Sequence, residues 1–396
     1  MRVLVLHNRY QIPGGEDSVF AQETAMLRAA GVTVETLETS NDHIEGFSQT
    51  IKAALLVPYS IPSRNLVAER IRAFRPDVMH AHNLFPTLTP SVYDACRQAG
   101  VPVIQTLHNY RLMCANAQLF RDGKVCTECL GKAFPMPAIR HSCYRGNRSG
   151  SIAVASMIGL HRMRHTWTRK VTRFIALTEF ARSLFSREMG ISMQQLALKP
   201  NAAADPGVGD GAGGYALFVG RLSPEKGIEI LLQAAAQAGG VGMPLKIAGS
   251  GSLQAQVEAA HARGNLEYVG HRDAAGVREL MKQARVLLIP SLWYEGLPMV
   301  VPEAFGAGLP IITSRIGALE TLIEDRFNGL LIEPGNRAAL AQAVRAVSKD
   351  SQLEQSMRSN ARKTYEDRYH PEANLRRLLE IYEEAIEAEH DRKKQD

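Results

Sequence analysis

The chain has 396 residues, of which 45% are apolar and 22% are charged, and its formal net charge is +6. This composition is that of a folded globular protein and excludes a largely disordered chain. No apolar run approaches the ~20 residues that span a bilayer. At roughly 150 residues per domain, the length predicts two domains.

The first half of the chain predicts a domain built around a parallel sheet. Apolar runs alternate with helical patterns such as residues 18–30, an order typical of βαβ units. The first run lacks the cleavage site of a leader peptide, so we expect it to be a strand and the protein to be cytoplasmic. This domain is predicted over 1–200, with a cysteine-rich insert at about 110–147. Its predicted strands are RVLVLH (2–7), VTVETL (32–37), DVMHAH (77–82), VPVIQTLH (101–108) and RFIALT (173–178).

The second half repeats the same alternation. Residues 201–214 (NAAADPGVGDGAGG) hold too much Gly, Ala, Asp and Pro for a regular element and predict a linker. A second domain is expected over 215–375, and residues 376–396 are expected to form a helix with a charged tail, able to pack on the first domain. The predicted strands are YALFVG (215–220), LKIAG (245–249), LEYVG (266–270), RVLLIP (285–290) and PIITS (310–314).

The resulting fold class is α/β, with two doubly wound, Rossmann-like domains. In open parallel sheets, ligands bind beyond the carboxyl ends of the strands. We therefore expect the loops that follow the strands of both domains to face a common cleft.

Charge is unevenly distributed along the chain. Residues 1–200 carry 24 Lys and Arg against 14 Asp and Glu, whereas 201–396 carry 22 against 26. Between Glu128 and Glu179 there are nine basic residues and no acidic one. Such a block fits an anionic partner, either a membrane surface, a phosphate-bearing lipid or nucleic acid, or else a solvated helix face. Within it, residues 151–171, which include Trp167, suit a helix lying on an anionic membrane or a core helix with one basic face.

Two loops have the character of phosphate sites. Gly14 and Gly15 follow the first strand and allow close backbone approach at a helix start, although a plain turn explains two glycines equally well. In GRLSPEKGIEILLQAA (220–235), Arg221 and Lys226 flank another expected helix start. Two cations beside exposed N–H groups would bind a diphosphate without a metal.

The sequence also predicts where the helix within residues 220–235 begins. Ser223 is expected to cap it and Pro224 to occupy its first position. Gly249 and Gly270 lie at the ends of the next two predicted strands and permit tight backbone passage. The backbone beside His271 is expected to meet the edge of a nucleotide base.

Two glutamates stand in the loop and helix after RVLLIPS. Glu295 lies in the loop, and Glu303 lies eight positions later in a helix that Pro298 is expected to open. Both carboxylates are able to accept hydrogen bonds from the hydroxyl groups of a sugar or a ribose. Pro302, directly before Glu303, is expected to bend the helix and to alter the direction of that carboxylate.

These motifs together resemble the family-four retaining glycosyltransferases, which have the GT-B fold of two Rossmann-like domains. The resemblance covers nearly the whole chain. It is carried by GGED (14–17), TLHNYRLMC (106–114), GRLSPEKG (220–227), PSLWYEGLPMVVPEAFGAGLPIITS (290–314) and GLLIEPGN (329–336).

The resemblance implies roles for residues of the second domain. Arg221 and Lys226 would hold the donor diphosphate. Glu295 would contact the donor sugar, and Glu303 would bind the nucleotide ribose.

In the first domain, the resemblance places Gly14 and Gly15 near the phosphates and His108 near the sugar. It implies transfer of a sugar from a nucleotide-sugar donor to a saccharide or a lipid-linked saccharide in cell-surface polysaccharide synthesis, with retention of configuration. No cofactor is expected for catalysis, because the chain contains no Asp-x-Asp pair. Alternatives are a non-catalytic nucleotide-sugar-binding subunit of a polysaccharide assembly complex, a phosphorylase of the same fold, and a zinc-dependent nucleic-acid-binding protein; no recognised nucleic-acid module supports the last.

Four of the five cysteines lie in the insert, with the spacing C-x11-C-x2-C-x13-C. In a cytosolic protein, this cluster predicts either a structural zinc site or free, redox-active thiols. Zinc would fix an insert of low apolar content. The four residues are Cys114, Cys126, Cys129 and Cys143.

Overall fold

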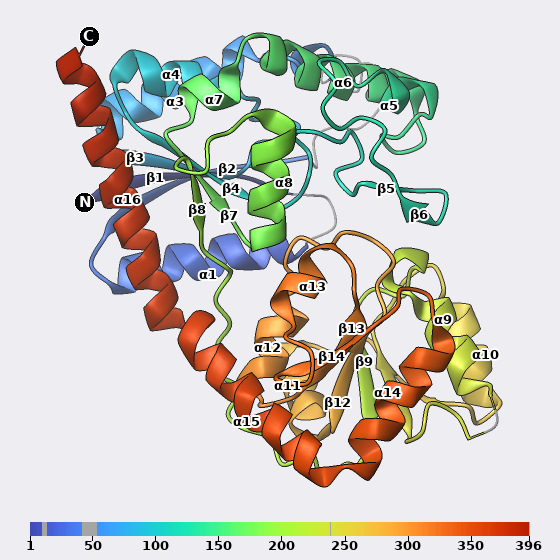
Figure 1. Cartoon of the computed structure of the whole chain (residues 1–396). Coiled ribbons are helices and arrows are strands. Elements are labelled where there is room, and N and C mark those ends of the chain that lie inside the picture. The colour runs from blue at the N-terminus through green and yellow to red at the C-terminus, as the bar shows by residue number, and fades with distance from the viewer. Residues whose placement is uncertain (10–13, 42–53, 238, 396) are drawn as a thin grey trace. The chain divides into compact units, whose positions relative to one another are not determined.

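The computed structural model describes residues 1–9, 14–41, 54–237 and 239–395. The chain forms two compact units: unit 1 contains Met1–Leu119, Thr127–Pro200 and Asn374–Asp396, and unit 2 contains Phe120–Cys126 and Asn201–Ala373. Each unit has its own six-stranded sheet with helices around it (Figure 1). The predicted α/β class with two doubly wound sheets is confirmed.

The sheet of unit 1 has the strand order β2-β1-β3-β4-β7-β8, and all neighbouring strands are parallel. Its central strands are covered on both faces, so every residue of β3 and β4 is buried. The strands are β1 (Arg2–Arg9), β2 (Thr33–Ser40), β3 (Val78–Asn83), β4 (Val103–Leu107), β7 (Arg173–Ala176) and β8 (Leu196–Leu198).

Local capping explains where several helices of unit 1 begin. The side chain of Ser60 accepts a hydrogen bond from the N–H of Ser63, and that of Thr178 accepts one from Ala181. These bonds satisfy N–H groups that have no partner within the helix. The helices around the sheet are α1 (Gly15–Ala29), α3 (Ile61–Phe74), α4 (Val92–Ala99) and α8 (Glu179–Met189).

The segment between β4 and β7 contributes most of a small apolar cluster, which Val57 and Phe85 from earlier in the chain complete. Ala138, Val154 and Ile158 belong to a cluster of buried side chains that joins two of its helices. The cysteine-rich sequence did not indicate this apolar content. The elements are a hairpin of β5 (Phe120–Arg121) and β6 (Lys124–Val125), then α5 (Met136–Arg140), α6 (Arg148–Met163) and α7 (Thr166–Lys170).

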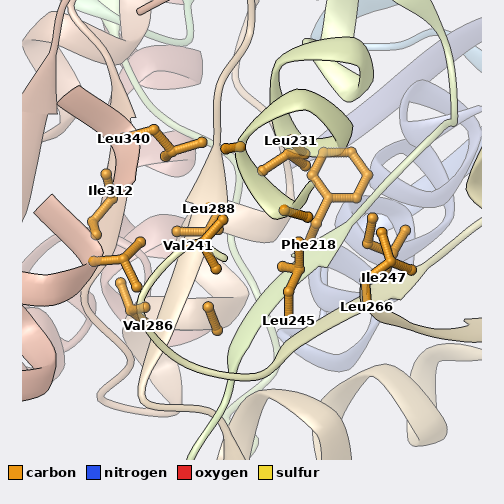
Figure 2. Close-up of a cluster of buried hydrophobic side chains, with 14 of the residues drawn as sticks. Phe218, Leu231, Val241, Leu245, Ile247, Leu266, Val286, Leu288, Ile312 and Leu340 are labelled. Carbon is orange, nitrogen blue, oxygen red and sulfur yellow. The ribbon is translucent and has the colours of Figure 1, made fainter. Parts of the chain in front are cut away.

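The sheet of unit 2 has the order β11-β10-β9-β12-β13-β14 and is also parallel. Phe218, Ile247 and Leu288 project from three of its strands into a buried cluster with Leu231 of α9 (Ile228–Ala235; Figure 2). The strands are β9 (Ala216–Val219), β10 (Leu245–Ala248), β11 (Glu267–Gly270), β12 (Val286–Ile289), β13 (Ile311–Ser314) and β14 (Gly329–Ile332).

Helices cover both faces of this sheet, with α9, α10 and α14 on one face and α11, α12 and α13 on the other (Figure 1). The elements are the 3₁₀ turn η1 (Pro224–Lys226), α9 (Ile228–Ala235), α10 (Gln254–Ala262), α11 (Ala274–Gln283), α12 (Val300–Gly306), α13 (Gly317–Leu322), α14 (Arg337–Lys349) and α15 (Ser351–Arg368).

Residues 201–214 form no helix or strand, but they are fixed to unit 2. Arg362 of α15 donates to both carboxylate oxygens of Asp205, at 2.7 and 2.8 Å. A Cβ on Gly209 would lie only 2.2 Å from the carbonyl oxygen of Lys282. The predicted linker is thus an irregular segment that packs on unit 2, and Gly209 is needed for that close approach.

The last helix, α16 (Pro371–Gln395), packs within unit 1 from Asn374 onward. Its buried apolar residues recur at the spacing of one helix face, and the hydroxyl of one of them, Tyr382, lies 2.8 Å from Nδ1 of His80 on β3. The stripe is Leu378, Ile381, Tyr382 and Ala385.

Candidate functional site

The residues predicted to bind a nucleotide follow four neighbouring strands of unit 2. Arg221 follows β9, Gly249 follows β10, Gly270 ends β11 and Glu295 follows β12. Because these strands are adjacent and parallel, their carboxyl ends meet at one edge of the sheet. The structure therefore brings these predicted residues to the same edge.

The turn after β9 differs in detail from the prediction. The Ser223 hydroxyl donates to Glu225 Oε1 at 2.7 Å, and Arg221 donates to the same oxygen at 2.9 Å. Ser223 thus occupies the predicted N-cap position, followed by Pro224, but its side chain accepts no capping hydrogen bond and donates to the Glu225 carboxylate instead. The Arg221 side chain remains 57% exposed.

Gly227 holds this turn against the end of β12. Its φ of 74° lies in the left-handed region that favours glycine, and a Cβ there would lie 2.0 Å from the carbonyl oxygen of Pro290. The N–H of Leu292 also donates to the Glu225 carbonyl at 2.9 Å. The two loops are thereby fixed to each other.

The side chains of these two loops meet in an ion pair. Lys226 Nζ donates to both carboxylate oxygens of Glu295, at 2.8 and 2.9 Å, and the Ser291 hydroxyl donates to Oε1 at 2.7 Å. Glu295 is buried, whereas the Lys226 side chain is 19% exposed. Lys226 Nζ also lies 5.4 Å from the ring centroid of Trp293, within cation–π range. The pair presents a partly accessible cation at the edge of the sheet.

Glu303 lies in the first turn of α12, after Pro302. Because N–H groups of a first turn lack intrahelical partners, Pro302 removes no hydrogen bond there, and the expected bend does not follow from it. The half-buried Glu303 carboxyl forms no hydrogen bond or ion pair with the described residues. Burial raises its pKa to about 7, although the positive charge of Arg278 acts in the opposite direction.

The glycine positions of unit 2 serve different purposes. A Cβ on Gly249 would lie 1.9 Å from the carbonyl oxygen of Gly220. Glycine at position 249 therefore allows the two backbones to come into direct contact. Gly270 has a positive φ of 75° and open space around it, and its carbonyl accepts from Gly249 N–H at 3.0 Å. His271 follows it and is exposed.

In unit 1, the first turn of α1 is bonded to the loop after β4. Gly15 begins α1, and the N–H of Gly14 donates to Asp17 Oδ2 at 2.7 Å. Asn109, directly after His108, donates to Glu16 Oε1 at 2.6 Å. The structure thus places His108 near the start of α1, where Glu16 and Asp17 add negative charge.

Below His108 lies a buried polar cluster that the sequence analysis missed. Glu23 of α1 pairs with Lys199 at 2.8 Å. Its Oε1 lies 3.4 Å from His80 Nδ1 and 3.3 Å from His82 Nε2, and His82 Nδ1 lies 3.0 Å from His108 Nε2. The available signal was the pair of histidines two positions apart in DVMHAH, since such residues point to the same face of a strand.

The surroundings of this cluster shift the pKa values of its ionisable groups. Burial alone would raise the pKa of Glu23, but the Lys199 ammonium, aided by the adjacent His82, outweighs it and holds that pKa well below its usual range. Burial, reinforced by His82, lowers the pKa of His80 and of His108 well below the usual range. Both histidines are therefore neutral near pH 7.

Glu23, His80 and His82 are also the group within metal-binding distance among the described residues. The Lys199 ammonium already balances the carboxylate, and His80 Nε2 lies 2.8 Å from the Thr106 hydroxyl. These contacts fit an ion pair with neutral imidazoles better than a metal centre.

The four cysteines do not form such a group in the described part of the chain. Cys129 is buried in the core of the insert with Cys143 packed on that core, and Cys114 Sγ lies 2.8 Å from Asn116 Oδ1. Cys126 belongs to the hairpin residues of unit 2. The zinc site stays a prediction.

The basic segment is partly built into unit 1. Trp167 is only 2% exposed, and its ring centroid lies 5.8 Å from that of His161, as in a core helix. Met163 and Ile152 of α6 are exposed. No helix in the described ranges is long and apolar enough to cross a membrane. Binding to an anionic membrane surface stays a prediction.

Comparison with known proteins covers both units. Residues 3–202, half of the chain, match the family model described as glycosyl transferase 4-like domain, and residues 210–364 match the model of glycosyl transferases group 1. Two uncharacterised glycosyltransferases of Methanocaldococcus jannaschii are 31% and 28% identical over 43% of this chain. These matches cover 45% and 48% of the relatives, so the chain spans about half the length of those proteins. A phosphatidyl-myo-inositol mannosyltransferase of Mycobacterium leprae is 24% identical over 87% of this chain and 86% of its own length.

Two solved structures share the fold. Anabaena HepE, in complex with UDP, has a TM-score of 0.67 and 17% identity over 96% of this chain and 99% of its own. Sucrose-phosphate synthase of Thermosynechococcus elongatus has a TM-score of 0.70 and 16% identity over 98% of this chain and 99% of its own. With two six-stranded parallel sheets flanked by helices, the fold is GT-B. By its family models and its fold, this chain belongs to the group 1 glycosyltransferases.

Proposed function

We propose that the protein transfers a sugar from a nucleotide-sugar donor to a saccharide or lipid-linked saccharide acceptor, in the synthesis of a cell-surface polysaccharide or glycolipid. The observation that carries the proposal is the Lys226–Glu295 pair beside Arg221 at the carboxyl edge of the unit 2 sheet. Two relatives of this chain support a role in polysaccharide or glycolipid synthesis. One is a phosphatidyl-myo-inositol mannosyltransferase, and the other is an amylovoran biosynthesis glycosyltransferase of Erwinia amylovora. HepE, of the same fold, has been solved with UDP and with UDP-glucose.

Each residue of this edge has a role in the proposal. Arg221 and Lys226 bind the donor diphosphate, because fixed cations bind phosphate oxygens by charge-assisted hydrogen bonds. Glu295 accepts hydrogen bonds from hydroxyl groups of the donor sugar. Glu303, which has no described partner, accepts them from the ribose.

The reaction breaks the bond between the anomeric carbon and the β-phosphate oxygen, and the electron pair leaves on that oxygen. The acceptor oxygen bonds to the anomeric carbon from the same face, and its proton passes to the departing phosphate. Configuration is thereby retained. The two cations bind the leaving group more strongly as its negative charge grows, so they lower the barrier without a metal ion.

A thermal-shift screen against UDP-, GDP-, ADP- and CMP-sugars, with and without a chelator, tests the proposal. A ligand that binds only the native state raises the melting temperature. We expect one nucleotide to produce a shift that persists in chelator, and transfer from that donor to give a product with the donor's anomeric configuration by NMR. Binding without any transfer would favour a non-catalytic subunit, and the absence of binding to every donor would contradict the proposal.

A further inference from the structure

Helix α6 of unit 1, which lies beside α5 (Figure 1), carries apolar side chains on both of its faces. Residues 149–160 include no charged side chain. Val154 and Ile158 are buried in the apolar cluster of unit 1, whereas Ile152 and Met163 are 46% and 66% exposed. A surface helix of a globular protein normally has polar residues on its solvent face. The exposed face of α6 is therefore unusually apolar.

The exposed apolar side chains follow one line along this helix. Ile152 and Met163 are close to three full turns apart, so they lie on the same side of α6, separated by roughly 16 Å. Gly159 lies between them on that side, where a Cβ would come within 2.4 Å of the Phe134 ring. Phe134 is 37% exposed, and Met136 nearby is also exposed. We call Phe134, Ile152 and Met163 the apolar patch.

Exposed cations flank the apolar patch. Arg148 is the first residue of α6, and Arg164 directly follows its last. The acid in this part of the sequence, Glu128, lies 3.4 Å from His141. Five exposed cations form no ion pair with a residue in the described ranges, so their positive charge has no carboxylate beside it. They are Lys132, Arg140, Arg145, Arg148 and Arg164.

An anionic bilayer surface fits both features of this surface. In a two-fold dimer the same surface would meet itself, which would bring the unpaired cations of the two copies together. A nucleic acid would neutralise the cations but would leave the apolar patch without an apolar environment. Anionic lipid headgroups attract Lys and Arg, and the boundary between headgroups and acyl chains accepts apolar side chains.

We infer that unit 1 binds the surface of an anionic membrane through the apolar patch, whose side chains insert between the lipids while the five cations contact the headgroup phosphates. This binding does not depend on the proposed function, because it uses this surface alone. Trp167, the aromatic residue of the basic segment, takes no part in it because its ring is buried in unit 1.

The first test uses the unsubstituted full chain and lipid vesicles. In flotation assays, vesicles that contain phosphatidylglycerol should bind the protein at least about tenfold more strongly than vesicles of phosphatidylcholine alone, because each basic residue near an anionic surface adds to binding. Binding should weaken as the salt concentration is raised from about 0.1 M to about 0.5 M, since salt screens exposed charges. Equal binding to both kinds of vesicle, or binding to neither, would overturn the inference.

The second test removes the apolar contribution. Ile152→Glu and Met163→Glu should each weaken binding to the phosphatidylglycerol vesicles by about tenfold, because a carboxylate is costly to remove from water. Met163→Leu should bind like the unsubstituted protein. Val208→Glu is the matched control, since Val208 is an equally exposed apolar residue of unit 2; its binding should be unchanged. Undiminished binding by both Ile152→Glu and Met163→Glu would overturn the inference.

Sedimentation without lipid tests the other occupant of the apolar patch, a second copy of the chain. Met163→Glu should have the same molecular mass as the unsubstituted protein. Its melting temperature should also be unchanged, because the substituted side chain is exposed. A dimer of the unsubstituted protein that dissociates in Met163→Glu would show that the apolar patch binds a second copy, and it would overturn the inference.

Discussion

Lys226 and Glu295 are bound to each other through both carboxylate oxygens, although they are 69 residues apart in the chain. Their loops follow the neighbouring strands β9 and β12, and Gly227 fixes one loop against the other. The charge of the cation proposed to bind phosphate is thus balanced before any donor arrives. An incoming diphosphate must share Lys226 with Glu295 or displace that carboxylate toward the sugar.

The variant Glu295→Gln should separate binding from turnover. Because the amide is uncharged, Lys226 is left available, and affinity for the nucleoside diphosphate should rise by about threefold to tenfold. Turnover should fall by about 10²-fold, since the contact to the donor sugar is weakened in the transition state. Calorimetry and steady-state kinetics measure the two effects. Turnover within threefold of the unsubstituted protein would remove Glu295 from the site.

Glu303 predicts a pH dependence of donor binding. Its pKa of about 7 means that the carboxyl is largely protonated below that pH, and the carboxylate is the stronger acceptor for the ribose hydroxyls. Affinity for a nucleotide sugar, whose diphosphate does not titrate in this range, should therefore rise between about pH 6 and pH 8. The variant Glu303→Gln should bind with nearly constant affinity over the same range. The same slope in both proteins would show that another group is responsible.

The buried cluster predicts a loss of stability in acid. His80 and His108 have lowered pKa values, so the unfolded chain takes up protons below pH ~6.5 that the native state refuses. Glu23 has a lowered pKa and adds a further loss as the pH falls below its ordinary value of 4.5. The melting temperature should fall as the pH is lowered from about 7.5 to 5.5, and by less in His80→Gln. A melting temperature that stays level in this range would contradict neutral buried histidines.

Cys129 tests the zinc prediction. Its side chain is buried in an apolar cluster, so Cys129→Ser should destabilise the protein by about 1–3 kcal/mol with or without metal. A zinc site adds a separate expectation: one zinc per chain by elemental analysis, lost in the variant. If the unsubstituted protein contains no zinc and a chelator does not change its melting temperature, the zinc prediction is wrong. Cys129 then acts only by packing in the apolar cluster.

The gathering of the predicted residues at one edge of the unit 2 sheet could be predicted because its signals are local. Arg221, Lys226 and Glu295 lie in loops that follow apolar runs, and a loop after a strand of a parallel sheet lies at the carboxyl edge of that sheet. The hydrogen bond from Ser223 to Glu225 was not predictable, because it depends on side-chain rotamers. The strands β8 and β14, of three and four residues, were not predicted.

The cluster of unit 1 could not be predicted, because tertiary contacts create it. Lys199 meets Glu23 across 176 residues, and Tyr382 of the last helix meets His80 across 302. Each partner alone resembles an ordinary surface or core residue. Only the order of the strands and the return of α16 to unit 1 bring them together.

The most direct measurement is calorimetric binding of the nucleoside diphosphate selected by the screen, in chelator, to the unsubstituted protein, to Lys226→Ala and to Lys363→Ala. Lys363 is exposed on α15 and gives the same change of charge away from the site. Removing a charge-assisted contact to phosphate should weaken binding to Lys226→Ala by about tenfold to 100-fold, with Lys363→Ala unchanged. Equal binding by Lys226→Ala and the unsubstituted protein would contradict the assignment of this edge of unit 2 as the donor site.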